Sequence, residues 1–237
     1  MDTFLITGSA GFIGFHIAKR MLDEGCKVIG IDNFSDYYDV KLKKDRASIL
    51  KTYSHYIEVQ GSIEEPDLLK NVCSKHHPDY FIHLAAQAGV RYSIDKPKVY
   101  LKSNIDGSFN IIESSHKIRA KHLIMASSSS VYGANKKLPF KEIDKTDHQI
   151  SFYAATKKST ECLAHTYSSL WKLPITMLRF FTVYGPWGRP DMAYFKFTKK
   201  ILNKRKIDIY NKGKMYRDYT YVDDIVDGIF KITNKIP

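Results

Sequence analysis

The 237-residue sequence has little cysteine and no long apolar run, and both shortages exclude whole classes of protein. Its three cysteines, Cys26, Cys73 and Cys162, are odd in number and far apart, so they form neither a disulfide framework nor a paired metal-ligand motif. No apolar stretch approaches the ~20 residues that a membrane-spanning helix needs. The first residues include an acid and no basic cluster, which argues against a secretory signal. We therefore predict a cytoplasmic protein without a membrane partner.

Arginine is scarce although the chain is basic. Of 37 Lys and Arg residues only 8 are Arg, and the formal net charge is +12. Because base readout and bidentate phosphate binding favour Arg, scattered Lys indicates a solvated surface, and we predict no nucleic-acid partner. The stretch 196–217, with nine basic residues and one acid, fits either a surface for a polyanion or a solvated helix whose cations contact ligand phosphates. The histidines lack ligand spacing, so we predict no metal.

Short apolar runs alternate with amphipathic stretches along the chain, which is typical of βαβ units and a parallel sheet. Strands are predicted at Thr3–Thr7, Lys27–Asp32, Tyr56–Gln60, Tyr80–Leu84, His122–Ala126, Ile175–Arg179 and Ile207–Tyr210. Helices are predicted at Phe12–Glu24, Val40–Leu50, Glu65–His76, Pro97–Lys117, Ser151–Trp171, Met192–Lys204 and Val222–Lys231. The pattern predicts an α/β fold with a Rossmann-type, doubly wound parallel sheet.

A glycine-rich turn follows the first predicted strand and opens the first helix. Gly8, Gly11 and Gly14 let the backbone approach a pyrophosphate, and the helix N-terminus offers free N–H groups to the phosphates. Asp32 ends the second strand, eighteen residues beyond Gly14. A carboxylate there can accept both hydroxyls of an adenosine ribose and repels a 2′-phosphate. The sequence predicts bound NAD rather than NADP; a purely conformational glycine turn with a surface Asp is the alternative.

A run of serines and a Tyr-x-x-x-Lys pair provide a second candidate site. Ser127–Ser130 follow the fifth predicted strand, at the edge where parallel sheets bind ligands. Tyr153 and Lys157 lie four apart in a predicted helix and share a face. A Lys ammonium beside a phenol, helped by a pyridinium, is expected to lower the pKa of Tyr153 towards neutrality. Such a phenol can take the proton of an alcohol whose hydride leaves; two surface residues are the alternative.

Longer segments carry a family resemblance. They are 31–39, 84–93, 126–133, 153–158 and 178–193, and the most specific are Asp36-Tyr37-Tyr38-Asp39 and Gly188-Arg189-Pro190-Asp191-Met192. Through these segments the chain resembles the extended short-chain dehydrogenase/reductase superfamily, and most closely its nucleotide-sugar 4-epimerases that act on UDP-glucuronate. The match runs from the first strand to about Lys231. The resemblance implies NAD as cofactor, a UDP-sugar as substrate, and a place in polysaccharide biosynthesis.

The resemblance also implies residue roles. Ser128 is expected to hydrogen-bond the sugar 4-hydroxyl, Tyr153 to act as the base, and Lys157 to hold the nicotinamide ribose. The expected cofactor-binding residues are Gly8, Gly11, Phe12, Ile13, Gly14, Asp32, Asn33, Ser62, Ile63, Leu84, Ala85, Ala86, Gln87, Asn104, Tyr153 and Lys157. The expected substrate-binding residues are Arg91, Ser129, Ser130, Thr182, Arg189, Tyr210 and Arg217. Among these, Ser129, Ser130 and Thr182 would face the uronate carboxylate, Tyr210 the uracil ring and Arg217 the pyrophosphate.

The reaction implied is epimerisation at C4 through a 4-keto sugar. Related dehydratases and decarboxylases place an acid in the turn before Val131, where this chain has Ser129 and Ser130. Where the family usually has Gly-Asp after the third strand, this chain has Gly61-Ser62, and a hydroxyl can replace that carboxylate at modest loss. The superfamily also implies a homodimer formed by the helices 97–117 and 151–171.

We expect two parts: an NAD-binding domain over 1–180, and a small, incomplete substrate lobe over 181–237. Family members continue beyond residue 237, and we expect that tail to cover the last strand and the last helix. We therefore expect UDP-glucuronate affinity at least about tenfold below that of longer relatives, with the segment after Lys196 mobile or covered by another subunit. An impaired NAD-binding remnant, a chain completed by a separate partner, an anion binder, and another nucleotide-sugar epimerase or decarboxylase are the alternatives.

Overall fold

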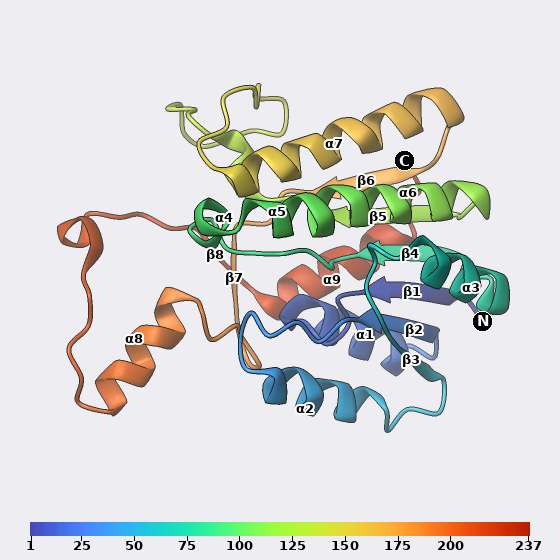
Figure 1. Ribbon diagram of the computed structural model, residues 1–237, viewed down its shortest axis with the longest axis horizontal. Helices are drawn as coiled ribbons and strands as arrows, with labels where there is room; N and C mark the ends of the chain where they lie inside the picture. Colours follow the sequence, from blue (N-terminus) through green and yellow to red (C-terminus); the bar gives the residue numbers. More distant parts are fainter.

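Six parallel strands form the central sheet of the computed structural model, which describes residues 1–237 except for the side chain of Tyr210. Their order is β3-β2-β1-β4-β5-β6 (Figure 1). The strands are β1 (Thr3–Thr7), β2 (Lys27–Asp32), β3 (Tyr56–Gln60), β4 (Tyr80–His83), β5 (His122–Ala126) and β6 (Ile175–Leu178). Because the order reverses between β1 and β4, the sheet is doubly wound, and the predicted Rossmann-type fold is confirmed.

Helices cover both faces of the sheet. On one face pack α1 (Phe12–Asp23), α2 (Val40–Leu50) and α9 (Val222–Thr233). On the other face pack α3 (Pro66–His76), α6 (Gly107–Lys117) and α7 (Phe152–Trp171). Each face has its own apolar core, so the strands are apolar on both sides, as in other sheets with helices on both faces. Among the described residues, none of the helices combines the length and the apolar composition that a membrane span requires.

The region 97–117, predicted as one helix, consists of three successive segments. They are α5 (Pro97–Tyr100), the π-helical segment η1 (Leu101–Asp106) and α6, and the short helix α4 (Tyr92–Asp95) precedes them. Asn104 lies in η1 and is fully buried. A π-helical turn accommodates an extra residue inside an α-helix, and a helical apolar pattern does not reveal it. Elsewhere the predicted helix and strand ends are right to within two residues, with one exception.

The exception is the strand predicted at Ile207–Tyr210, which is wrong. Residues 205–209 are irregular, and the 3₁₀ turn η3 (Tyr210–Gly213) follows. Asn211 and Lys212 have φ values of 47° and 51°, and such left-handed residues end an extended run. A second, two-stranded parallel sheet forms instead from β7 (Thr182–Tyr184) and β8 (Tyr219–Tyr221). Strands of three residues are too short to show an alternating pattern.

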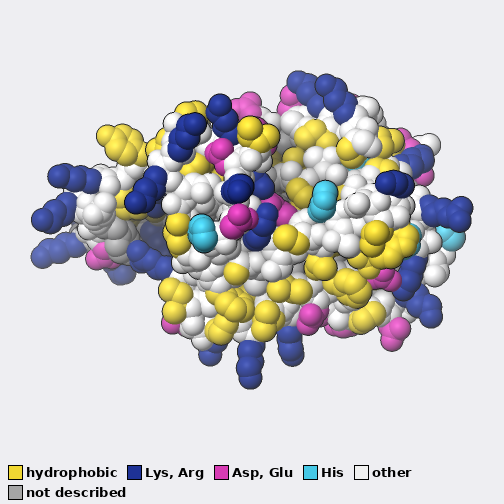
Figure 2. All heavy atoms as spheres, turned by 90° about the horizontal axis from the view of Figure 1, so that it is seen from above, with side chains coloured by type: hydrophobic (Ala, Val, Ile, Leu, Met, Phe, Trp, Pro, Cys, Tyr) yellow, Lys and Arg dark blue, Asp and Glu magenta, His cyan; other side chains and the backbone are white. Residues whose placement is uncertain are grey.

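The segment after residue 181 divides between the core and the surface. Val222, Val226 and Ile229 of α9 are buried with α1, so the expectation that the last helix lacks cover is wrong. Helix α8 (Ala193–Leu202) has no buried residue, and Figure 1 shows it extending away from the sheet. Lys and Arg side chains of the stretch 196–217 gather at that end of the molecule (Figure 2). The boundary at residue 180 stays a prediction.

Candidate active site

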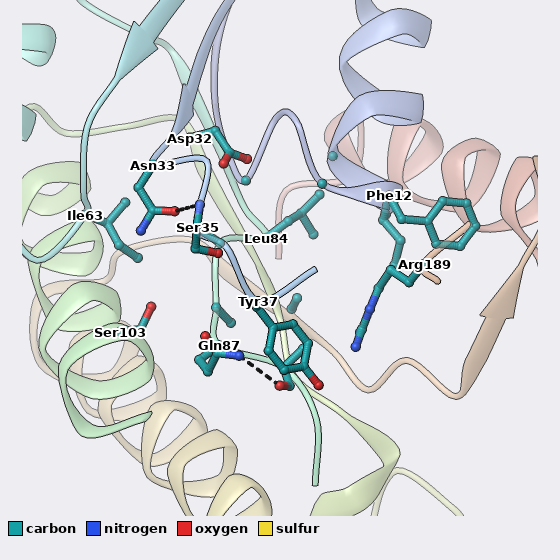
Figure 3. A pocket seen from close by; sticks show the side chains of 18 of the residues that line it. Phe12, Asp32, Asn33, Ser35, Tyr37, Ile63, Leu84, Gln87, Ser103 and Arg189 are labelled. Carbon is teal, nitrogen blue, oxygen red and sulfur yellow. Dashed lines mark hydrogen bonds between the residues drawn. The ribbon is translucent and has the colours of Figure 1, made fainter. Parts of the chain in front are cut away.

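A cavity of about 330 Å³ opens at the carboxyl ends of β1, β2, β4 and β5, on both sides of the point where the strand order reverses (Figure 3). Open parallel sheets bind their ligands in this crevice. Most of the residues predicted to bind a cofactor or to react line it: Gly8, Gly11, Phe12, Ile13, Gly14, Asp32, Asn33, Ile63, Leu84, Ala85, Ala86, Gln87, Ser128, Tyr153, Lys157 and Arg189. The structure thus brings segments from seven parts of the sequence to one cavity.

The glycine turn between β1 and α1 forms one wall of the cavity. Gly8 has a φ of 70°, and a Cβ there would lie 2.9 Å from the backbone nitrogen of Ala85. A Cβ on Gly14 would lie 1.9 Å from the carbonyl oxygen of Gly8. Gly11 caps α1 without a side-chain hydrogen bond, so the first N–H groups of this twelve-residue helix have no side-chain acceptor there. A helix start of this kind fits a pyrophosphate.

Asp32 lies at the end of the cavity formed by β2 (Figure 3). Its carboxylate accepts hydrogen bonds from the backbone nitrogens of Ala10, at 3.0 Å, and Phe34, at 2.8 Å. Burial raises the pKa of Asp32, while these bonds and the charges of Lys43 and Arg46 act in the opposite direction. Each carboxylate oxygen has a second lone pair, so Asp32 can still accept the hydroxyls of a ribose. The arrangement fits the adenosine half of NAD.

Two further residues predicted to bind the cofactor, Ser62 and Asn104, do not line the cavity. Ser62 lies directly beside it and forms a hydrogen bond with Glu64, which does line it. Asn104 supports it from behind: its Oδ1 accepts from the backbone nitrogen of Gln87 at 2.8 Å. Its Nδ2 donates to the carbonyl of Gln87 and to Thr156 Oγ1, both at 3.1 Å. Asn104 therefore ties the loop after β4 to α7.

Ser128, Tyr153 and Lys157 meet at the opposite side of the cavity, beside β5. Burial raises the pKa of Tyr153, and a hydrogen bond to Ser128 and the charge of Arg189 only partly offset it. In the protein alone, the expectation of a lowered Tyr153 pKa is therefore wrong, because removing the phenolate from water outweighs the charge of Arg189. Lys157 donates from Nζ to the carbonyl of Ala126 at 2.8 Å. Burial lowers the pKa of Lys157 to about 8.

A buried ion pair that the sequence did not suggest stands behind the serine turn. Glu161, one helical turn beyond Lys157, accepts from the Ser127 hydroxyl at 2.6 Å. Its two oxygens also accept from Arg179 Nε and Nη2, each at 2.9 Å. Burial acts to raise the pKa of Glu161, but the hydrogen bonds from Arg179 and Ser127 outweigh it and lower that pKa. The pair holds the end of β5, and with it Ser128, against α7.

Of the predicted substrate-binding residues whose side chains the structure describes, Arg189 alone lines the main cavity. Arg189 enters the cavity beside Tyr37, and Arg189 Nε donates to Asp191 Oδ1 at 3.0 Å (Figure 3). Ser129 and Ser130 line a neighbouring cavity of about 140 Å³. Arg91, Thr182 and Arg217 line neither cavity, and the predicted uracil contact, Tyr210, has its side chain outside the described residues.

Several lining residues had no role from the sequence. Tyr37, Tyr38 and Lys43 line the cavity from the loop after β2 and from α2. Lys43 Nζ donates to the carbonyl and hydroxyl oxygens of Ser35, at 2.7 and 2.9 Å. The Asp-Tyr-Tyr-Asp segment, distinctive in the sequence, was the signal that could have assigned the tyrosines. In the described part of the chain, no group of three or more His, Cys, Asp or Glu is placed to hold a metal ion.

Comparison with known proteins agrees with the family resemblance seen in the sequence. The model of the NAD dependent epimerase/dehydratase family matches residues 4–236. A Rhizobium meliloti protein described as "Probable UDP-glucuronate 4-epimerase" is 52% identical over 234 residues, which is 99% of this chain and 69% of that protein. UDP-glucuronate 4-epimerase 4 of Arabidopsis thaliana is 50% identical over 230 residues, which is 95% of this chain and 52% of that protein. The crystal structure of UDP-glucuronic acid 4-epimerase from Bacillus cereus, with UDP-glucuronic acid and NAD, is similar with a TM-score of 0.92 and 34% identity, over 98% of this chain and 73% of that one.

Proposed function

Since the chain belongs to the NAD dependent epimerase/dehydratase family, whose members are enzymes that use NAD, we propose that it interconverts UDP-glucuronate and UDP-galacturonate by epimerisation at C4. One observation carries the proposal. Ser128, Tyr153 and Lys157 line the same cavity as the glycine turn and Asp32, in a chain about half identical to relatives named for this reaction. An NAD site and an acid–base group therefore face one space.

In this proposal, different residues of the chain bind the cofactor and transfer the proton. The N-terminus of α1 would hold the pyrophosphate of NAD, Asp32 the adenosine ribose, and Lys157 the nicotinamide ribose. NAD, when bound, supplies reversible hydride exchange with C4 of the sugar. Tyr153 takes the proton of the 4-hydroxyl and later returns it, and Ser128 keeps that hydroxyl within hydrogen-bonding reach. Burial raises the pKa of Tyr153, and Arg189 acts to lower it. The charges of Lys157 and of a bound pyridinium would have to lower this pKa further for the phenol to act as a base.

The distribution of acids favours epimerisation over elimination or decarboxylation. Among the described residues, the acidic side chains that line the main cavity are Asp32, the last residue of β2, and Glu64, which follows β3. Tyr153 stands on the other side of the reversal point, beside β5. No carboxylate that lines the cavity is therefore beside the sugar to move a second proton. The hydroxyls of Ser129 and Ser130, with Arg189 nearby, suit the uronate carboxylate, because neutral donors can satisfy an anion.

The test is product analysis. Purified protein with NAD and UDP-glucuronate should form UDP-galacturonate, separated by chromatography, and Tyr153→Phe should lower kcat by roughly 10²–10⁴ without abolishing NAD binding. Tyr216→Phe is the matched control, because that phenol is 99% exposed. Near-normal turnover by Tyr153→Phe would refute the mechanism. A UDP-pentose as main product would indicate a decarboxylase, and NAD binding without turnover would indicate an impaired remnant.

We also propose a homodimer formed by the outer face of α5, η1, α6 and α7. Figure 2 shows hydrophobic side chains gathered along the lower edge of that view. Leu101, Phe109, Leu170 and Trp171 are exposed on these elements, and an apolar patch of this kind is typical of an interface. Phe109→Asp should shift the mass measured by light scattering from dimer to monomer.

The three cysteines are unpaired, which supports a reducing compartment, the cytoplasm.

A further inference from the structure

Arg46, on α2, is fully buried and is not used in the reaction proposed above. Its Nη1 donates to the carbonyl of Ala10 and to the hydroxyl of Tyr38, both at 2.9 Å. Its Nη2 donates to the carbonyl of Trp187 at 2.5 Å. The three acceptors belong to the glycine turn, the loop after β2, and the loop 185–191 after β7. One guanidinium therefore joins the wall of the NAD site to the loop that carries Arg189.

The surroundings of Arg46 indicate a role in geometry more than in stability. The three groups that its terminal nitrogens contact are neutral oxygens. In the described part of the chain its Nε is buried without a hydrogen-bond partner. A buried cation with neutral partners is costly to desolvate. Charge is present at longer range, because Arg46 and Lys43 both act to lower the pKa of the buried Asp32.

The conformation of the loop 185–191 depends on contacts with residues outside the loop, such as Arg46. Trp187 has a φ of 58°, a left-handed conformation that is unfavourable for a bulky residue and persists only where surrounding contacts fix it. His16 Nε2 lies 2.9 Å from the carbonyl oxygen of Pro186, and the rings of Phe15 and Trp187 are 5.9 Å apart. The Arg46 hydrogen bond fixes the carbonyl of Trp187 itself. Arg189, two residues later, reaches the cavity.

We propose that Arg46 is a positioning residue that couples the NAD site to the sugar-nucleotide site. When the pyrophosphate orders the glycine turn, the carbonyl of Ala10 is fixed, and through Arg46 so is the carbonyl of Trp187. Arg189 then meets the sugar nucleotide at a lower cost in conformational entropy. Because such coupling is reciprocal, each nucleotide strengthens binding of the other. The inference rests on the proposed function, since it assumes that NAD and a sugar nucleotide share this cavity.

The test measures the coupling directly, with UDP as the probe and calorimetry as the readout. In the wild-type protein, saturating NAD should tighten UDP binding at least about fivefold. In Arg46→Lys, which keeps the charge but cannot contact all three acceptors, the ratio should fall below about twofold. Arg20→Lys is the matched control and should keep the wild-type ratio, because Arg20 of α1 is partly exposed and lines neither cavity. A purely structural Arg46 would instead weaken both affinities and leave their ratio unchanged.

Hydrogen exchange of the wild-type protein gives a second measurement that needs no variant. NAD should slow exchange of the Trp187, Gly188 and Arg189 amides and leave α8 unchanged. If UDP and NAD bind the wild-type protein independently, if Arg46→Lys keeps the ratio, or if NAD leaves the three amides unprotected, the coupling is refuted and the proposed function stands. If the wild-type protein binds neither nucleotide, both proposals are refuted.

Discussion

Replacing Glu161 with glutamine tests how strongly the buried ion pair holds the catalytic end of β5. The substitution removes the negative charge that faces Arg179 and leaves a partly buried guanidinium without a counterion. Breaking a buried pair from one side typically costs about 3–5 kcal/mol. Arg179 is 20% exposed, still donates to the carbonyl of Glu142 at 3.1 Å, and lies 5.0 Å from the centre of the Tyr132 ring. We therefore expect a loss of about 2–3 kcal/mol in the free energy of unfolding, at or below the lower end of that range.

Urea unfolding followed by circular dichroism at pH 7 measures this loss. Glu24→Gln is the control: it breaks the Arg20–Glu24 pair, which has a similar length of 2.8 Å but is solvated, and should cost about 0–1 kcal/mol. Replacing both partners, with Glu161→Leu and Arg179→Met together, should recover most of the lost stability, because no unpaired charge remains. An unfolding free energy for Glu161→Gln within about 0.5 kcal/mol of the wild-type value would refute the reasoning.

The contribution of Glu161 to the free energy of unfolding should decrease at acidic pH. The pKa of Glu161 is lowered from its ordinary value of 4.5, so the carboxylate contributes stability that is fully present above pH 4.5. This contribution is lost as the pH falls through the pKa of the folded state. The difference between wild type and Glu161→Gln should therefore shrink at acidic pH. A difference that stays constant down to about pH 2 would show that the charge of Glu161 is not what stabilises the protein.

Three further predictions follow from the cavity walls and the last helices. Asp32→Ala should reduce a preference for NAD over NADP of at least about tenfold to near parity in calorimetry, and equal affinities in the wild type would refute the role of the carboxylate. Gly14→Ala should abolish NAD binding, because its Cβ would lie 1.9 Å from the carbonyl oxygen of Gly8, whereas Gly228→Ala, with nothing within 4 Å, should be neutral or stabilising by up to about 1 kcal/mol. In hydrogen exchange, α9 should be protected and α8 should exchange fast, since α9 has buried residues and α8 has none; equal protection would contradict this packing.

Local sequence patterns were sufficient for the sheet and for the cofactor wall. The strand at His122–Ala126 and the roles of Gly8 and Gly14 depend on neighbouring residues along the chain, so composition and spacing predicted them. Two features that the sequence did not predict depend on distant residues. Arg46 contacts Trp187 across 141 positions. The raised pKa of Tyr153 follows from burial, which a four-residue spacing does not report.

The π-helical segment η1 has a consequence for which changes of length this chain tolerates. Deleting one residue from 101–106 would give an uninterrupted α-helix of ordinary propensity, so the local backbone could accommodate the deletion. At 3.6 residues per turn, however, everything after the deletion would rotate by about 100° relative to α5. Ile111 and Ile112 would leave the core, or Asn104 would lose Gln87 and Thr156. Contacts at both ends of the segment therefore fix the number of residues in this helix.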